Sequence, residues 1–177
     1  MKTNKWILDP SHSEMVFKVK HLMISTVTGH FRNFNVEAYV EDDDFSKIST
    51  IRFTAEVDSI DTGDKNRDEH LKSAHFFDLE KHSQIKFVST HFGISENVGI
   101  LSGNLTIMEV TRPITLNVEF GGVALDNYGQ TKAGFTIDGK ISRKEFGMTW
   151  GPVTEAGSIV VGDEVKFHSE IQLMKQP

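Results

Sequence analysis

The amino-acid sequence predicts an all-β protein built from antiparallel strands, and three observations support this. Apolar and polar residues alternate along most of the chain, which is typical of strands with one buried and one solvated face. Residues that favour turns separate these alternating stretches. Helical periodicity is confined to one short segment, so few helices exist to make the crossovers that parallel strands require.

The alternation predicts about eight strands, each with apolar residues spaced two apart on one face. They cover residues 15–20, 34–40, 51–57, 85–87, 105–107, 114–120, 133–141 and 165–173. The turn signals between strands are Asp42-Asp43-Asp44, Asn97-Val98-Gly99, Asp126-Asn127-Tyr128-Gly129 and Ala156-Gly157-Ser158. Eight such strands can pack as a sandwich or close as a barrel. A barrel of this size either fills with side chains or holds one small ligand.

One segment interrupts the strand pattern between the third and fourth predicted strands. Residues 64–73 read as a short helix, for which Asp61, Thr62 and Asp64 are candidate N-caps. The pair Phe76-Phe77 follows this helix. An amphipathic insertion at this place would cover one end of a barrel.

Length and composition limit the classes of protein to which the chain can belong. Its 177 residues are expected to form one domain, residues 1–177. The net charge of −6 argues against a nucleic-acid partner, which would favour a basic face. The absence of cysteine excludes disulfides, thiolate nucleophiles and cysteine-ligated zinc.

The chain also lacks the apolar segments that direct proteins into or across membranes. No stretch approaches the roughly 20 apolar residues of a membrane helix, so no stable membrane insertion is expected. The apolar run Trp6-Ile7-Leu8 is shorter than the roughly 7–15 residues of a signal-peptide core. We therefore expect a cytoplasmic location.

Candidate catalytic and metal-binding residues occur without a specific motif. Asp9, Ser11 and His12 are the residue types of a hydrolase triad. They are adjacent in sequence, however, and no Gly-x-Ser-x-Gly elbow occurs, which favours a turn held by side-chain hydrogen bonds. The eight histidines show no His-x-His or His-x-x-x-His spacing, so neither a metal site nor a cofactor is expected.

Arg67 and His70 on the predicted helix have two interpretations. A guanidinium pairs with phosphate or carboxylate in fork geometry, so the two residues could hold an anionic head group. Alternatively, this stretch could form a structural ion-pair network that attaches the helix to the rim of a barrel.

The inward phenylalanines and the strand glycines bear on whether the sheet closes around a cavity. Taken alone, inward phenylalanine indicates a core, and the 13 phenylalanines cannot distinguish a filled barrel from a hollow one. Glycines within or beside strands often mark bulges or bends of a closing sheet. These glycines are Gly29, Gly103, Gly134, Gly139 and Gly147.

Blocks spread over almost the whole chain together resemble the YceI-like family of lipocalin-like polyisoprenoid-binding proteins. The N-terminal blocks are Trp6-x-x-Asp9-x-x-His12-Ser13, Phe17-x-Val19-Lys20-His21-Leu22 and Gly29-x-Phe31. The central blocks are Ser59-Ile60-Asp61-Thr62, Arg67-Asp68-x-His70-Leu71-Lys72-Ser73 and Phe76-Phe77-Asp78. The C-terminal blocks are Leu105-Thr106-Ile107, Val110-Thr111-Arg112-Pro113-Ile114, Arg143-x-x-Phe146-Gly147-Met148 and Val161-Gly162-Asp163-Glu164-Val165.

The resemblance implies an extended eight-stranded antiparallel lipocalin-like β-barrel that forms a homodimer. It also implies an amphipathic lipid in the interior, such as a polyisoprenoid, an isoprenoid quinone or a fatty-acid amide, and supplies no catalytic residue. The head-group candidates at the mouth are His21, Arg67 and His70. The residues expected to line the cavity are Met15, Phe17, Val19, Phe53, Ile85, Phe87, Leu105, Ile107, Leu116, Phe120, Phe135, Ile137 and Phe167.

The resulting hypothesis is non-enzymatic sequestration or transport of a long-chain lipid. One alternative is a small hydrolase or isomerase that uses His12, Asp68 or His70 as acid or base. Another is a metal-binding or stress-adaptor module whose barrel is filled with side chains. Co-purifying lipid, stoichiometric zinc and the size of the cavity distinguish these alternatives.

Overall fold

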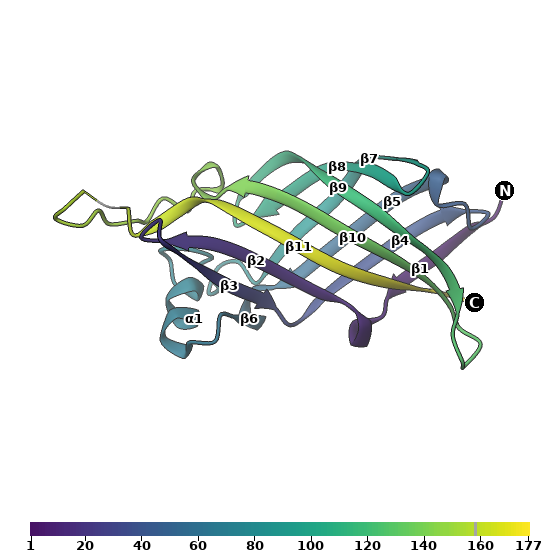
Figure 1. Cartoon of the computed structure of the whole chain (residues 1–177), viewed down its shortest axis with the longest axis horizontal. Helices are drawn as coiled ribbons and strands as arrows, with labels where there is room; N and C mark the ends of the chain where they lie inside the picture. The colour runs from purple at the N-terminus through teal and green to yellow at the C-terminus, as the bar shows by residue number, and fades with distance from the viewer. Residues whose placement is uncertain (158) are drawn as a thin grey trace.

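The protein is an antiparallel β-barrel (Figure 1). The structure is a computed structural model that describes residues 1–157 and 159–177. Eight of the described strands are hydrogen-bonded in the order β1-β4-β5-β7-β8-β9-β10-β11, and β11 pairs back with β1. The strands of this ring are β1 (Thr3–Leu8), β4 (Phe34–Glu41), β5 (Ile48–Glu56), β7 (Gln84–Ser95), β8 (Val98–Ile107), β9 (Val110–Leu125), β10 (Thr131–Ser142) and β11 (Val161–Lys175). The predicted eight-stranded barrel is confirmed.

Three further strands extend the sheet beyond the ring: β2 (Glu14–His21), β3 (Ser25–Phe31) and β6 (Ile60–Asp61). Strand β2 pairs with residues 161–170 of β11, whereas β1 pairs with the end of β11. The predicted strand 15–20 therefore lies outside the ring, and β1, which the alternation did not predict, closes it. The polar Asn4 takes an inward position in β1 together with Trp6, and this obscures the alternation in the sequence.

The described helices are short. The predicted helix is α1 (Lys65–Lys72), and the Asp64 side chain caps it by accepting the backbone N–H of Arg67 at 3.0 Å. The 3-10 helices are η1 (Pro10–His12), η2 (Phe45–Lys47), η3 (Val57–Ser59) and η4 (Arg143–Phe146). Within the described ranges, no helix is long and apolar enough to cross a membrane.

The turn signals lie near strand ends, with one shift. Asp42 and Asp43 both adopt positive φ between β4 and η2. Around residue 97 the left-handed residue is Glu96, and Val98 already belongs to β8. The turn therefore lies one residue earlier than Asn97-Val98-Gly99 suggested. Ser158, the last residue of the fourth signal, lies outside the described residues.

An aromatic cluster lies inside the barrel, where η2 and β1 meet β9 and β10. Figure 1 shows both chain termini at this end of the barrel. Phe45 from η2 inserts there, and its ring lies 4.9 Å from that of Trp6, 5.3 Å from Phe120 and 5.2 Å from Phe135. Phe120 and Phe135 are themselves 5.1 Å apart. These four residues are called the distal aromatic cluster below.

Candidate ligand-binding cavity

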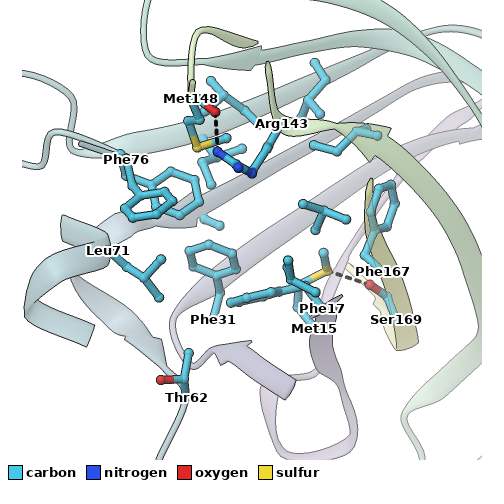
Figure 2. A pocket seen from close by; sticks show the side chains of 18 of the residues that line it. Met15, Phe17, Phe31, Thr62, Leu71, Phe76, Arg143, Met148, Phe167 and Ser169 are labelled. Carbon is cyan, nitrogen blue, oxygen red and sulfur yellow. Dashed lines mark hydrogen bonds between the residues drawn. The ribbon is translucent and has the colours of Figure 1, made fainter. Parts of the chain in front are cut away.

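The other half of the barrel is hollow. A cavity of about 360 Å³ lies between β2, β5, β7–β11 and the segment that carries α1. Its wall is almost entirely apolar, and Figure 2 shows Met15, Phe17, Phe31 and Phe167 directed into it. Ser169 is buried in this wall, and its hydroxyl donates to the sulfur of Met15 at 2.7 Å.

Most residues that the sequence placed on the cavity wall do line it. These are Met15, Phe17, Val19, Phe53, Ile85, Phe87, Leu105, Ile107, Leu116, Ile137 and Phe167. The alternation in each strand correctly indicated which side chains point inward. Their contact with a ligand stays a prediction.

Phe120 and Phe135 do not line this cavity, contrary to the expectation. Both belong to the distal aromatic cluster, where Phe45 packs between them and Trp6. Alternation predicts that a side chain points into the barrel. It does not predict its depth along the barrel axis, and at this depth Phe45 fills the interior.

Three phenylalanines of the wall each lie against a glycine. A Cβ added to Gly29 would lie 2.2 Å from Cζ of Phe17, on the adjacent strand. At Gly139 it would lie 2.7 Å from Cζ of Phe167, and at Gly103 it would lie 2.4 Å from Cζ of Phe87. These glycines make room for rings against the wall, so that the rings do not fill the cavity. Of the predicted bulge glycines, Gly134 lies at a register shift between β9 and β10.

Arg143 is a mouth residue that the head-group candidates did not include. Its guanidinium, with only 3 % of the residue exposed, lies on the cavity wall (Figure 2). It donates to the carbonyl oxygens of Met148 and Trp150 at 2.6 Å, of Gly162 at 2.8 Å and of Val161 at 3.2 Å. One side chain thus joins the segment after η4 to the start of β11.

The buried positive charge of Arg143 is hydrogen-bonded to neutral backbone carbonyls and not to a carboxylate. Burial lowers the pKa of this guanidinium, and the negative charge of Asp163 partly offsets the effect. Arginine nevertheless remains charged in proteins. The sequence did contain a signal, because Arg143 opens the block that ends in Gly147-Met148.

A hydrogen-bonded network around Thr62 attaches the start of α1 to the barrel. The Arg67 guanidinium donates to Oγ1 of Thr62 at 2.7 Å and to its carbonyl oxygen at 2.6 Å. The Asp68 carboxylate accepts from the hydroxyl and the backbone N–H of Thr62 at 2.6 and 2.9 Å. Arg67 thus helps to attach the helix, as the structural interpretation expected, but its described partners are neutral oxygens of Thr62 and not the predicted ion pairs. The side chain also borders the cavity.

His70 belongs to a second cluster at the mouth. Its Nε2 lies 2.9 Å from Nδ1 of His75, and its ring contacts that of Trp150 at 4.6 Å edge-on. His75 stacks on Trp150 at 5.4 Å, and Phe76 lies 5.5 Å from the same indole. We call His70, His75, Phe76 and Trp150 the mouth cluster. It joins α1 and the residues after it to the segment before β11.

The three head-group candidates all border the cavity near its mouth. Arg67 and His70 come from α1, and His21 comes from the end of β2. The structure therefore brings them to one end of the cavity. Whether they contact a head group stays a prediction.

The first candidate motif forms a structural turn. The buried Asp9 carboxylate accepts from Nζ of Lys132 at 2.6 Å and from the Ser11 hydroxyl at 2.8 Å, and it lies 2.8 Å from Nδ1 of His12. Burial alone would raise the pKa of Asp9, but these hydrogen bonds outweigh it and hold the pKa far below its ordinary value.

The residues of the enzymatic alternative have separate partners. His12 lies beside Asp9 on the turn between β1 and β2. On α1, Asp68 bonds to Thr62, which precedes the helix, and His70 bonds to His75, which follows it. Among the described residues, no group of three or more His, Asp or Glu side chains is arranged to hold a metal ion.

Comparison of the sequence with known proteins assigns a family. Residues 6–173 match the YceI-like domain. A UPF0312 protein of Staphylococcus epidermidis is 36 % identical over 171 residues, which cover 95 % of this chain and 96 % of that protein. A UPF0312 protein of Staphylococcus aureus is 35 % identical over 167 residues, with 93 % and 94 % coverage.

Solved structures share the fold. The YCEI protein of Campylobacter jejuni aligns with a TM-score of 0.75 and 28 % identity over 90 % of this chain and 91 % of its own. Burkholderia cenocepacia BcnA aligns with a TM-score of 0.79 and 22 % identity, over 93 % and 98 % of the two chains. A polyisoprenoid binding domain from Saccharophagus degradans aligns at 0.67 with 14 % identity, over 97 % and 98 %. The chain belongs to the YceI-like family.

Proposed function

We propose that this protein binds a long-chain amphipathic lipid, with the apolar chain inside the barrel and the head group at the mouth. The observation that carries the proposal is the cavity, because an apolar space of about 360 Å³ is walled by side chains from most strands of the barrel. Apolar surface gains about 25 cal/mol for each Å² removed from water, so this wall favours a hydrocarbon chain.

The glycine positions support a binding cavity over a filled barrel. Protein cores pack densely. In a barrel selected only for stability, residues larger than glycine next to Phe17 and Phe167 would push these rings inward and fill the interior. Here Gly29 and Gly139 have no side chain, which leaves space for those rings to lie against the wall. The volume is within the range of roughly 300–1,000 Å³ that is typical of ligand pockets.

The mouth offers polar groups for a head group. His21, Arg67 and His70 border it, and the buried Arg143 adds a positive charge next to the apolar wall. We expect a head group with hydrogen-bond acceptors, because guanidinium groups donate only.

A polyisoprenoid is the ligand class that we favour, since a structural neighbour is a polyisoprenoid binding domain. An isoprenoid quinone and a fatty-acid amide remain within the proposal. The proposed role is sequestration or transport without catalysis, by a homodimer.

Lipid extraction from the purified protein, followed by mass spectrometry, tests the proposal. A prenyl or acyl lipid at near-stoichiometric amounts is expected, together with uptake of added geranylgeraniol by the emptied protein. Ile137→Trp, which places an indole in the cavity, should abolish uptake, whereas Val88→Trp on the exposed face of β7 should not. The proposal is refuted if no lipid co-purifies with the wild type and the emptied wild type takes up no added lipid.

A further inference from the structure

Two segments at the cavity mouth expose apolar side chains side by side. Between β2 and β3, Met23 is 57 % exposed and Ile24 is 82 % exposed; before β11, Val153 is 63 % exposed and Ile159 is 48 % exposed. The backbone N–H of Leu22 donates to the carbonyl of Val160 at 2.9 Å and holds the two segments together. Met23, Ile24, Val153 and Ile159 are called the apolar rim.

The rim is continuous with the cavity. Three residues that line the cavity lie next to rim residues in the sequence. His21 lies two residues before Met23, Val160 directly follows Ile159, and Trp150 lies three residues before Val153. Figure 1 shows both rim segments at the end of the barrel away from the two chain termini. Because the distal aromatic cluster occupies the other end, the proposed lipid would enter the cavity at the end that carries the rim.

The backbone of the first rim segment is also unusual. Leu22 and Met23 have φ values of 51° and 59°. Non-glycine residues seldom adopt this left-handed region, and those that do are mostly Asn, Asp or His. A polar or glycine-containing turn would connect β2 and β3 with less strain, so the apolar side chains are not explained by turn geometry.

The charge of the rim favours one kind of partner. In residues 20–27 and 149–161 the charged side chains are Lys20 and Glu155, which cancel. These two segments thus add no net charge to the mouth, which suits contact with the interface of a zwitterionic bilayer. Trp150 at the border of the cavity is of the residue type enriched at that interface.

We propose that the apolar rim docks the barrel on the surface of a lipid bilayer, with the cavity mouth facing the membrane. The inference rests on the proposed function, since a lipid ligand resides in the membrane. Docking would let the hydrocarbon chain move between bilayer and cavity without crossing water.

Exposed apolar residues at the opposite end provide a matched control. Val123, Leu125 and Tyr128 lie around the β9–β10 turn, near the distal aromatic cluster. No cavity lining residue belongs to this turn. If exposure alone caused membrane binding, both ends would contribute equally.

The test is flotation of the full chain with phosphatidylcholine vesicles, using Met23→Asp/Ile24→Asp as the rim variant and Val123→Asp/Leu125→Asp as the control. The rim variant should lose at least about tenfold in vesicle affinity, because two side chains no longer enter the apolar layer. The control should bind as the wild type does. The single variant Ile24→Asp, at the most exposed rim position, repeats the test with less risk to folding.

A second measurement separates docking from ligand binding. Uptake of a soluble fluorescent geranylgeranyl probe should be equal in all variants, since neither pair of substitutions lies on the cavity wall. Loss of flotation with retained uptake supports docking. Equal flotation of the wild type and the rim variant overturns docking. Docking is also overturned if the wild type does not float and is a dimer, while the rim variant is a monomer, because the rim would then be a dimer interface. Failure of probe uptake by the wild type refutes the proposed function, while flotation still decides docking.

Discussion

The ring of Phe17 occupies the space over Gly29 on the neighbouring strand, where a Cβ would lie 2.2 Å from Cζ of the ring. The two residues are register partners between β2 and β3. Phe17 is buried and lines the cavity, so its position sets the width of the cavity at this point.

Gly29→Ala should therefore destabilise the protein and reduce lipid uptake. The methyl group displaces the Phe17 ring into the cavity, and such overpacking costs about 1–3 kcal/mol. Urea unfolding and uptake of a prenyl probe measure the two effects. Gly134→Ala, where an added Cβ meets no atom within 4 Å, is the control. Phe17→Leu in the Gly29→Ala background should restore stability, and a double variant as unstable as the single one would contradict the explanation.

Asp9→Asn should destabilise the fold through the buried Asp9–Lys132 pair. Removing one partner of a buried ion pair costs about 3–5 kcal/mol where the other charge stays uncompensated. Lys132 keeps Asp126 at 3.8 Å, so we expect a loss at or below the lower end of this range. Urea unfolding at pH 7 measures this. Glu164→Gln breaks exposed pairs with Lys140 and Lys166 and should change stability by less than about 1 kcal/mol.

The same carboxylate should make stability depend on acid pH. The pKa of Asp9 is lowered in the folded protein, so its stabilisation is complete above the unfolded pKa of about 3.9 and is lost as the pH falls below it. Urea unfolding from pH 7 to pH 3 should show the gap between wild type and Asp9→Asn becoming smaller. A gap that stays constant over this range would show that the charge of Asp9 contributes nothing.

Arg143→Met should loosen the mouth, because four carbonyl groups lose their donor. Hydrogen exchange measured by mass spectrometry should accelerate in peptides covering residues 147–162. Arg112→Met is a matched control, since Arg112 is exposed and donates from Nε to the carbonyl of Glu145 at 2.6 Å. If exchange is equal in the two variants, Arg143 does not hold this segment in place.

Trp150→Ala should speed release of a bound lipid. The indole contacts His70, His75 and Phe76, and each aromatic pair contributes about 0.5–1.5 kcal/mol. We expect release of a fluorescent prenyl probe to vesicles to become roughly three- to tenfold faster, the equivalent of about half to one such pair. Trp150→Phe keeps a ring at this position and should stay close to the wild type. Unchanged release by Trp150→Ala would mean that the mouth cluster does not close the cavity.

Some features of the barrel follow from local patterns in the sequence. Alternation predicted which side chains point inward, and the strand positions of Phe17, Phe87 and Phe167 agree with it. Asp64 was a candidate N-cap for α1 and does cap it. Such features depend on neighbours in sequence, which is why a single chain reveals them.

Other features depended on residues distant in sequence. The closure of the ring required β1 to pair with β4 and with β11. The paired residues are 30 to 38 positions apart in the first case and 165 to 169 positions apart in the second. The alternation in residues 3–8 was too irregular to predict this strand. Phe120 and Phe135 do not line the cavity because Phe45 fills the interior at their depth. Phe45 belongs to η2, between β4 and β5.

By itself, the sequence determined the antiparallel strands, their inward faces and the short helix, because side-chain alternation and helix capping act over a few residues. The tertiary structure decided that the sheet closes through β1, that one half of the barrel is filled and the other hollow, and that Arg143 is buried at the mouth. The physical reason is that strand stagger and long-range packing determine how deep each inward side chain lies, and alternation carries no information about depth.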